Sequence, residues 1–198
     1  MRLPRTAHTE RPWRIHEIAR DFTVEDVWEL PTPGGPDELD RLVRQFAGGI
    51  REGVRGDAPL SRFLFAVRWR LGALLRLDGA DAGVGARVPS LRDRLPDDLR
   101  DGPRGPDLGE APFTSVYLTH DEWAAEMRNR TVHGVLHLGW VPVGADRYTG
   151  RMTVLVKPNG TLGALYMLAI KPFRYLGVYP ALLRRIGRQW RAGQPAGM

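Results

Sequence analysis

Two histidines four residues apart, His133 and His137, are the side chains of this sequence best suited to chemistry. On a helix, this spacing would bring both imidazoles to one metal ion. On a strand, it separates them by about 13 Å, which is too far for a shared ion. The surrounding valines favour a strand, so we expect both side chains on one face of a sheet. There each imidazole can act as an acid, a base or a hydrogen-bond donor, and the alternative is a pair of hydrogen-bonded structural histidines.

One basic and several aromatic side chains are expected near these histidines. Arg151 lies on the next expected strand and can share their face, where a guanidinium would hold a carboxylate or an enolate oxygen. The alternative is an arginine that points outward from an amphipathic sheet. Tyr117, Trp140 and Tyr166 are large amphipathic residues near the expected interface between sheet and helix. Aromatic side chains at such places serve either as core or as the lining of a ligand site.

The sequence lacks the standard motifs of several enzyme classes. It contains no Gly-x-x-x-x-Gly-Lys-Ser/Thr loop, no Gly-x-Gly-x-x-Gly, no Gly-x-Ser-x-Gly turn and no His-Glu-x-x-His motif. It contains no cysteine, which removes thiolate chemistry and disulfides. What remains is non-covalent binding or acid–base chemistry in a cavity, and we expect neither a cofactor nor a metal ion.

The elements of the first half of the chain follow from hydrophobic periodicity. Residues 13–18 alternate apolar and polar side chains and are expected to form a strand, and Thr23 is expected to begin a short helical turn. Helices are expected over residues 37–47, ended by the two glycines that follow, and over residues 61–77. Residues 78–111 are rich in Gly, Pro, Asp and Arg. They predict a long loop that is either a lid or binding loop or disordered.

The second half of the chain is expected to contain an antiparallel sheet and a long closing helix. Strands are predicted at residues 113–118, 130–141 and 147–157, with a helical turn at residues 120–126. The longest of these strands carries the histidines on one face and large apolar residues on the other. Residues 161–191 predict a helix with a wide apolar face, interrupted at its prolines. This order of elements predicts one α+β domain that spans the whole chain.

Charge is distributed unevenly along the sequence. The formal net charge is +6, and no Asp or Glu occurs after Asp146, although nine Lys or Arg residues do. This favours an anionic partner, such as an acidic carrier protein, or a solvated arginine face that docks on the chain's own acidic loops. Nucleic acid is not expected, because no known nucleic-acid-reading motif occurs. There is neither a signal peptide nor an apolar run of about 18 residues, so we expect a cytoplasmic protein without a transmembrane segment.

Six stretches of the sequence carry a resemblance to a known family: residues 26–35, 87–95, 133–140, 156–160, 172–174 and 179–180. They resemble an uncharacterised bacterial family, domain-of-unknown-function family 2867. The family resemblance specifies no reaction. The order of the expected elements also resembles the helix-grip fold of the START-like and polyketide-cyclase superfamily (SRPBCC).

The helix-grip resemblance implies a curved antiparallel sheet that wraps the long C-terminal helix and leaves an apolar cavity beside it. It implies a hydrophobic or aromatic small-molecule ligand. The activity would be that of a cyclase, dehydratase or isomerase acting by acid–base chemistry, or that of a non-catalytic carrier. The candidate catalytic residues are His133, His137 and Arg151. The candidate lining residues are Trp28, Tyr117, Trp140 and Tyr166. Two questions stay open at this point: which sheet face lines the cavity, and whether the protein forms a homodimer.

Overall fold

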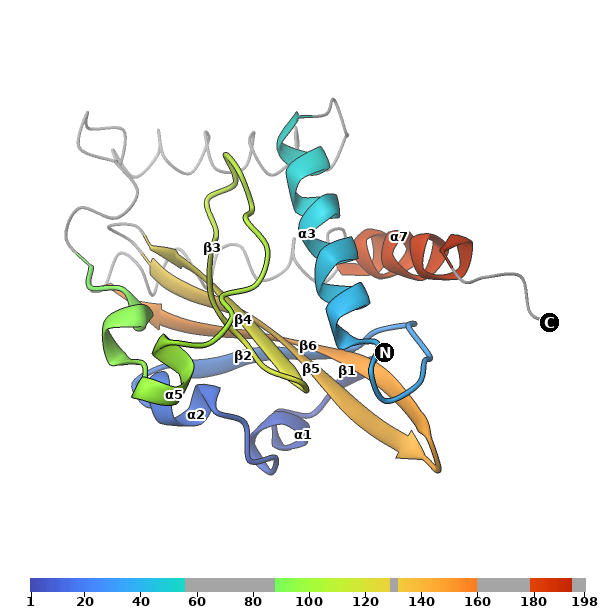
Figure 1. The fold of residues 1–198 in the computed structure, drawn as a ribbon, viewed down its shortest axis with the longest axis horizontal. Helices are drawn as coiled ribbons and strands as arrows, with labels where there is room; N and C mark the ends of the chain where they lie inside the picture. Colours follow the sequence, from blue (N-terminus) through green and yellow to red (C-terminus); the bar gives the residue numbers. More distant parts are fainter. Residues whose placement is uncertain (56–87, 129–131, 160–178, 194–198) are drawn as a thin grey trace.

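A six-stranded antiparallel sheet forms the centre of the fold (Figure 1). The structure is a computed structural model, and it describes residues 1–55, 88–128, 132–159 and 179–193. The strand order is β1-β2-β6-β5-β4-β3. The strands are β1 (Arg2–Leu3), β2 (Thr23–Glu29), β3 (Thr114–Leu118), β4 (Glu122–Arg128), β5 (Val132–Gly144) and β6 (Arg147–Pro158). The predicted α+β class is confirmed.

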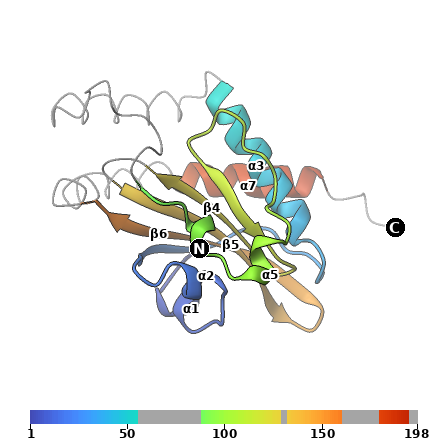
Figure 2. The same ribbon diagram turned by 60° about the vertical axis from the view of Figure 1, so that its left-hand side comes forward.

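Helices cover both faces of this sheet (Figures 1 and 2). The longer helices α3 (Leu39–Arg55) and α7 (Tyr179–Ala192) lie on one face. The other face is covered by four short helices: α1 (Thr6–Thr9), α2 (Ile15–Ile18), η1 (Leu91–Arg94) and α5 (Asp97–Arg100). Among the described residues, none of the helices is long and apolar enough to cross a bilayer.

The core on the side of α3 and α7 is rich in tryptophan. Trp140 of β5 lies 5.9 Å from Trp190 of α7, measured between ring centroids. The loop after β2 completes this contact, because the Trp140 indole donates to the Gly35 carbonyl and the Trp190 indole donates to the Pro33 carbonyl. The indole N–H groups of Trp140 and Trp190 therefore both have an acceptor, as burial of a polar group requires.

The core on the other face is smaller and is made largely of aliphatic residues. Ile15 and Ile18 of α2 and Leu91 of η1 are buried there against Val135 of β5 and Leu155 of β6. The N-terminal segment and the 88–100 segment are too short to form independent helices, since isolated helices of a single turn are unstable in water. Packing on the sheet therefore holds them in place.

Three predictions of local structure were wrong, and the error in β4 has a clear physical cause. Residues 13–18 contain helix α2 rather than a strand, and the region after Thr23 is strand β2 rather than a helical turn. Residues 120–126, predicted as a helical turn, belong largely to strand β4, in which five successive residues from Glu122 to Glu126 are buried. A strand covered on both faces shows no alternation of apolar and polar residues, so the period-two signal is lost.

The strands predicted in the second half of the chain agree with the structure, whereas the predicted end of the first long helix was wrong. The strands predicted at residues 113–118, 130–141 and 147–157 correspond to β3, β5 and β6. The helix predicted to end at residue 47 continues through both glycines to Arg55 as α3. Open space surrounds both glycines, so neither is a packing point or a stop. The helix expected at residues 61–77 and the first part of the helix expected at residues 161–191 lie outside the described residues.

Candidate functional site

Two glutamate–histidine pairs lie side by side on the sheet face that the short helices cover. Glu122 and Glu126 of β4 and His133 and His137 of β5 share this face. In each pair a histidine Nε2 lies 2.8 Å from a glutamate Oε2, joining His133 to Glu126 and His137 to Glu122. All four side chains are at most 2% exposed. The four-residue spacing on one strand thus matches the four-residue spacing on its neighbour, and each pair is a diagonal contact across the ladder.

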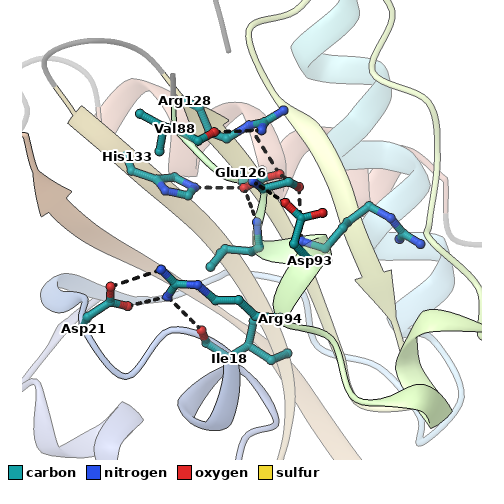
Figure 3. A network of polar contacts seen from close by, with 11 residues as sticks. Ile18, Asp21, Val88, Asp93, Arg94, Glu126, Arg128 and His133 are labelled. Carbon is teal, nitrogen blue, oxygen red and sulfur yellow. Dashed lines mark hydrogen bonds and ion pairs between the residues drawn. The ribbon is translucent and has the colours of Figure 1, made fainter. Parts of the chain in front are cut away.

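The His133–Glu126 pair is an anchor for the 88–100 segment (Figure 3). Glu126 accepts a hydrogen bond from the Ser90 hydroxyl at 2.5 Å and one from the Leu91 amide at 3.0 Å. Arg128 adds an ion pair at 3.5 Å. The Glu126 carboxylate is therefore surrounded by donors, and this pair holds η1 against the sheet.

The His137–Glu122 pair joins the sheet to the N-terminal segment. Glu122 accepts a hydrogen bond from the Arg14 amide at 2.6 Å, just before α2. It also accepts one from the Tyr117 hydroxyl at 3.0 Å. A register shift in β3 between Ser115 and Tyr117 places the tyrosine on this face, which is a common effect of a β-bulge.

Both carboxylates are held in the ionised form. Burial alone would raise the pKa of Glu122, but the hydrogen bonds from His137, the Arg14 amide and the tyrosine outweigh it and leave that pKa below its ordinary value. Burial would likewise raise the pKa of Glu126, but hydrogen bonds, with His133 as the main donor, outweigh it and lower that pKa. Burial, and then the charge of Glu122, raise the pKa of Tyr117 well above its usual range, so its hydroxyl stays protonated.

Ionised Glu122 determines which nitrogen of His137 carries a proton. A carboxylate can only accept, so Nε2 of His137 is the donor in this pair. The other nitrogen, Nδ1, then carries a lone pair whenever the imidazole is neutral. That nitrogen is buried and has no hydrogen-bond partner in the part of the chain that the structure describes.

Three further polar atoms near His137 are buried without a hydrogen-bond partner among the described residues. They are Nε2 of His8, Nε1 of Trp13 and Nε of Arg151. The ring centroids of His8 and Trp13 lie 5.0 Å and 5.2 Å from that of His137. Arg151 reaches the same region, because its Nη1 donates to the Ala7 carbonyl at 2.5 Å. Buried polar atoms are rarely unpaired in native proteins, so this cluster, here called the His137 site, requires an explanation.

The charge state of the His137 site follows from its burial. Burial is the main cause that lowers the pKa of His8 to about 2, and the neighbouring basic side chains of His137, His16 and Arg151 oppose a further positive charge there. His8 is therefore neutral at physiological pH, and its Nδ1 lies 3.1 Å from the Thr153 hydroxyl. Burial and nearby Arg11 lower the pKa of Arg151, an effect that Glu29 opposes, but a guanidinium stays charged.

The structure divides the residues of the predicted site between the two faces of the sheet. His133, His137, Arg151 and Tyr117 share the face beneath the short helices. Trp28 and Trp140 lie in the core on the side of α3 and α7, where Trp28 packs 4.9 Å from Tyr179. Tyr166 lies outside the described residues.

Sequence reasoning missed both glutamates, His8 and Trp13. The Glu-x-x-x-Glu spacing of β4, set beside the His-x-x-x-His spacing of β5, was the available signal. This matching spacing was not recognised, because residues 120–126 were predicted to form a helical turn and not a strand beside β5. No comparable signal marks His8 and Trp13, which reach the site only because the N-terminal segment folds back over the sheet.

Neither a metal site nor the visible cleft coincides with these residues. Within the described ranges, no three His, Asp or Glu side chains are arranged to hold a metal ion. A cleft of about 750 Å³ opens between the loop at residues 29–35 and the β5–β6 hairpin, and it is lined by none of the predicted catalytic residues. The His137 site is closed to solvent, because His8, Trp13 and His137 are all buried.

The fold and the site define a class of α+β domain in which an antiparallel sheet carries buried glutamate–histidine pairs on one face. The chain belongs to the family described as "Protein of unknown function (DUF2867)", whose model matches residues 18–181. The match includes both glutamate–histidine pairs, whereas His8 and Trp13 precede it. Searches of curated proteins and of solved structures gave no match to this chain.

Proposed function

We propose that this protein is an acid–base enzyme that acts on a hydrophobic or aromatic small molecule at the His137 site. The observation that carries the proposal is the state of His137: its Nε2 is bonded to ionised Glu122, while its buried Nδ1 has no partner among the described residues. An imidazole oriented by a carboxylate is the usual arrangement of a general base. Cyclisation, dehydration and isomerisation are the reaction types that fit.

The proposed proton transfer uses residues of this chain alone. His137 Nδ1 takes a proton from a carbon next to a carbonyl, and the electron pair of that C–H bond moves to the carbonyl oxygen as an enolate. Glu122 stabilises the imidazolium that forms. Arg151 and Trp13 are the nearby N–H donors that can bind the oxyanion. Return of the proton to another atom of the same molecule completes an isomerisation.

The site proposed here differs in place from the one that the helix-grip resemblance implies. That resemblance suggests a pocket on the α7 side, whereas the His137 site lies beneath α1 and α2 on the opposite face. The antiparallel sheet and the packing of α7 on it support a helix-grip-like architecture as part of the proposal.

Access to the site requires movement of the N-terminal segment. His8 and His137 are 0% and 1% exposed, so a substrate reaches Nδ1 only when the segment that carries α1 and α2 lifts from the sheet. We call this segment, residues 4–18, the N-terminal cover. Closure of such a cover over a substrate would exclude water and strengthen the interactions inside.

Solvent deuterium exchange tests the proposal without knowledge of the product. Aryl alkyl ketones are incubated with the protein in D2O, and deuterium at the carbon next to the carbonyl is measured by mass spectrometry. We expect the wild-type protein to catalyse exchange, and His137→Gln to lower the rate by about 100-fold to 10,000-fold, the usual contribution of a general base.

His133→Gln is the matched control, because His133 has the same kind of partner on the same strands. We expect it to retain most of the exchange rate. Equal rates in the wild-type protein and His137→Gln, with both folded by circular dichroism, would refute the role of His137. A ketone that binds the wild-type protein but never exchanges would instead indicate a carrier.

A second candidate function rests on the surface of α7. Arg184, Arg188 and Arg191 are exposed and follow one another along one side of this helix. Such a row suits an acidic partner, for which a carrier protein is the proposed example. Binding of an acidic acyl carrier protein that weakens steeply with salt supports this candidate, and binding that is absent at low salt contradicts it.

A further inference from the structure

We infer that the His137 site binds a planar monocarboxylate, held by the indole N–H of Trp13 and the guanidinium of Arg151 beside the His137 ring. This inference rests on the site of the proposed function and names the class of ligand that it takes. The starting observation is that both N–H groups are buried and lack an acceptor among the described residues.

The types of the unpaired atoms require a ligand with oxygen acceptors. An indole Nε1 and an arginine Nε can only donate hydrogen bonds. Trp13 is 4% exposed, so solvent does not satisfy its indole N–H. Leaving a buried donor unsatisfied is unfavourable, and an acceptor in the site would remove that cost. Nδ1 of His137 lies nearby and, when the imidazole is neutral, it accepts a hydrogen bond instead of donating one. It is therefore the atom that would accept a proton from the ligand.

The charge around the site favours a single negative charge. Arg151 has no carboxylate within hydrogen-bond distance in the described part of the chain, and it donates instead to the neutral Ala7 carbonyl. His8 is neutral and adds no charge. Ionised Glu122 is already held by His137, the Arg14 amide and Tyr117, so the Arg151 guanidinium is the charge left for a ligand, and a single negative charge matches it.

A glycine lets the Trp13 ring approach the strand that carries His137. Gly139 lies two residues after His137 on the same face of β5, and its partner across the ladder is Arg151. The Trp13 ring lies directly over Gly139, because a Cβ atom there would come within 2.7 Å of it. Trp13 therefore packs beside His137 over the residue that pairs with Arg151, which brings the two donors to the same part of this sheet face.

Planarity of the ligand follows from the rings that surround the site. Trp13 and His8 both meet His137 edge to face, at interplanar angles of 62° and 74°. These rings present flat apolar surfaces around the polar atoms, an arrangement that suits a carboxylate attached to an aromatic or conjugated group.

Benzoate and its neutral counterpart benzamide test the inference by binding alone. Each is titrated into ¹⁵N-labelled protein at pH 7, and the indole signal of Trp13, assigned with Trp13→Phe, is followed by NMR. We expect benzoate to shift this signal and to bind at least about tenfold more tightly than benzamide, as a charge-assisted pair would give. Equal affinities, or no shift of the Trp13 signal by benzoate, would overturn the inference and leave ordered water as the occupant.

Arginine variants add a second test. We expect Arg151→Gln to remove the preference for benzoate over benzamide, and Arg147→Gln, an exposed arginine on the same strand, to keep it. A preference that survives in folded Arg151→Gln would overturn the role of Arg151. If that variant fails to fold, the comparison of the two probes on the wild-type protein still decides the matter.

The exchange assay separates failure of this inference from failure of the proposed function. Aryl keto acids are compared with the corresponding amides. Exchange that depends on His137 but is equal for acids and amides supports the enzyme and refutes the carboxylate site. Selective binding of benzoate by a protein that exchanges neither set supports the carboxylate site and refutes the enzyme.

Discussion

His8 is a buried residue whose neutrality makes the stability of the protein sensitive to pH. Burial lowers the pKa of His8 to about 2, whereas the unfolded chain binds a proton near pH 6.5. The unfolded state therefore gains protons first as the pH falls. The contribution of neutral His8 to the free energy of unfolding is therefore fully present above about pH 6.5, and it is lost progressively as the pH falls towards 2.

We expect His8→Asn to flatten the pH dependence of the free energy of unfolding between pH 6 and pH 5. One titrating group contributes at most about 1.4 kcal/mol per pH unit, so the wild-type protein should lose about 1 kcal/mol more than the variant over this interval. Urea denaturation at both pH values measures the difference. His120→Asn is the control, because that side chain is 90% exposed, and an equal change in slope would contradict the assignment to His8.

Glu126 is the residue that should matter most for the attachment of the 88–100 segment. Glu126→Gln keeps the shape of the side chain but presents an amide group to the Ser90 hydroxyl and the Leu91 amide, which both donate to it now. We expect a loss of about 3 kcal/mol, as for other broken buried pairs. Because the pKa of Glu126 is lowered, the loss should shrink as the pH falls through that pKa, where the wild-type carboxylate is also protonated.

Urea denaturation of Glu126→Gln at neutral and acidic pH checks this prediction. Glu110→Gln, at an exposed position, is the matched control and should be neutral. A variant as stable as the wild-type protein at neutral pH would show that η1 is held by its apolar contacts alone.

At the scale of elements, the N-terminal cover depends on one close approach to β5. Gly139→Ala would drive a methyl group to within 2.7 Å of the Trp13 ring, so the cover must lift or the strand must shift. We expect a loss of about 1–3 kcal/mol, the usual cost of overpacking, and faster hydrogen exchange over residues 4–18. Gly134→Ala on the same strand meets its nearest atom, Met127 Cε, at 3.8 Å and should be tolerated.

A Gly139→Ala variant with unchanged hydrogen exchange in the cover would contradict the contact between Trp13 and β5. The same variant bears on the proposed function, because its methyl group displaces Trp13 and also comes within 3.4 Å of His137 Cε1. A protein with a loosened cover should bind benzoate more weakly if Trp13 is one of its donors.

The strands of the hairpin could be predicted from the sequence, and β4 could not. Along β5 and β6, β-branched and polar residues alternate with large apolar ones, so both the strands and the shared face of His133 and His137 followed directly. In β4 the run Glu-Trp-Ala-Ala-Glu is buried throughout and uses residues that favour helices. Contacts on both faces of the sheet override this preference for a helix. Because β4 was not predicted as a strand, the glutamate partners of the two histidines were not predicted either.

The cover and the choice of face depend on long-range packing that no local pattern contains. His8 reaches Thr153 across 145 positions of sequence, and the Arg14 amide reaches Glu122 across 108. The alternation of residue types in β5 correctly predicted that the histidines and Trp140 lie on opposite faces of the sheet. It did not indicate which of these faces packs against α7. The family was predicted from short stretches, and the family match confirms it.

At the scale of the whole molecule, the sheet is covered on both sides by elements of unequal stability. β5 and β6 lie at its centre and pair along most of their length, whereas α1 and α2 are helices of four residues each. We expect the amides of β5 and β6 to exchange only by global unfolding and those of residues 4–18 to exchange by local opening.

Native-state hydrogen exchange measured by mass spectrometry tests this difference. Equal protection of the cover and of the central strands would mean that the His137 site opens only when the protein unfolds, which would make access by a substrate too slow for catalysis. Benzoate should slow exchange in the cover and leave β5 and β6 unchanged, because the ligand would be bound beneath it.

The alternation of β5 also limits how this family can diverge. Neighbouring residues of the strand belong to different cores, with His137 on one side and Leu136 and Leu138 on the other. Gain or loss of one codon between His133 and Trp140 would invert every later side chain, burying tryptophan where imidazole belongs. Viable descendants are therefore expected to keep the length of this stretch and to differ only by replacement of individual amino acids.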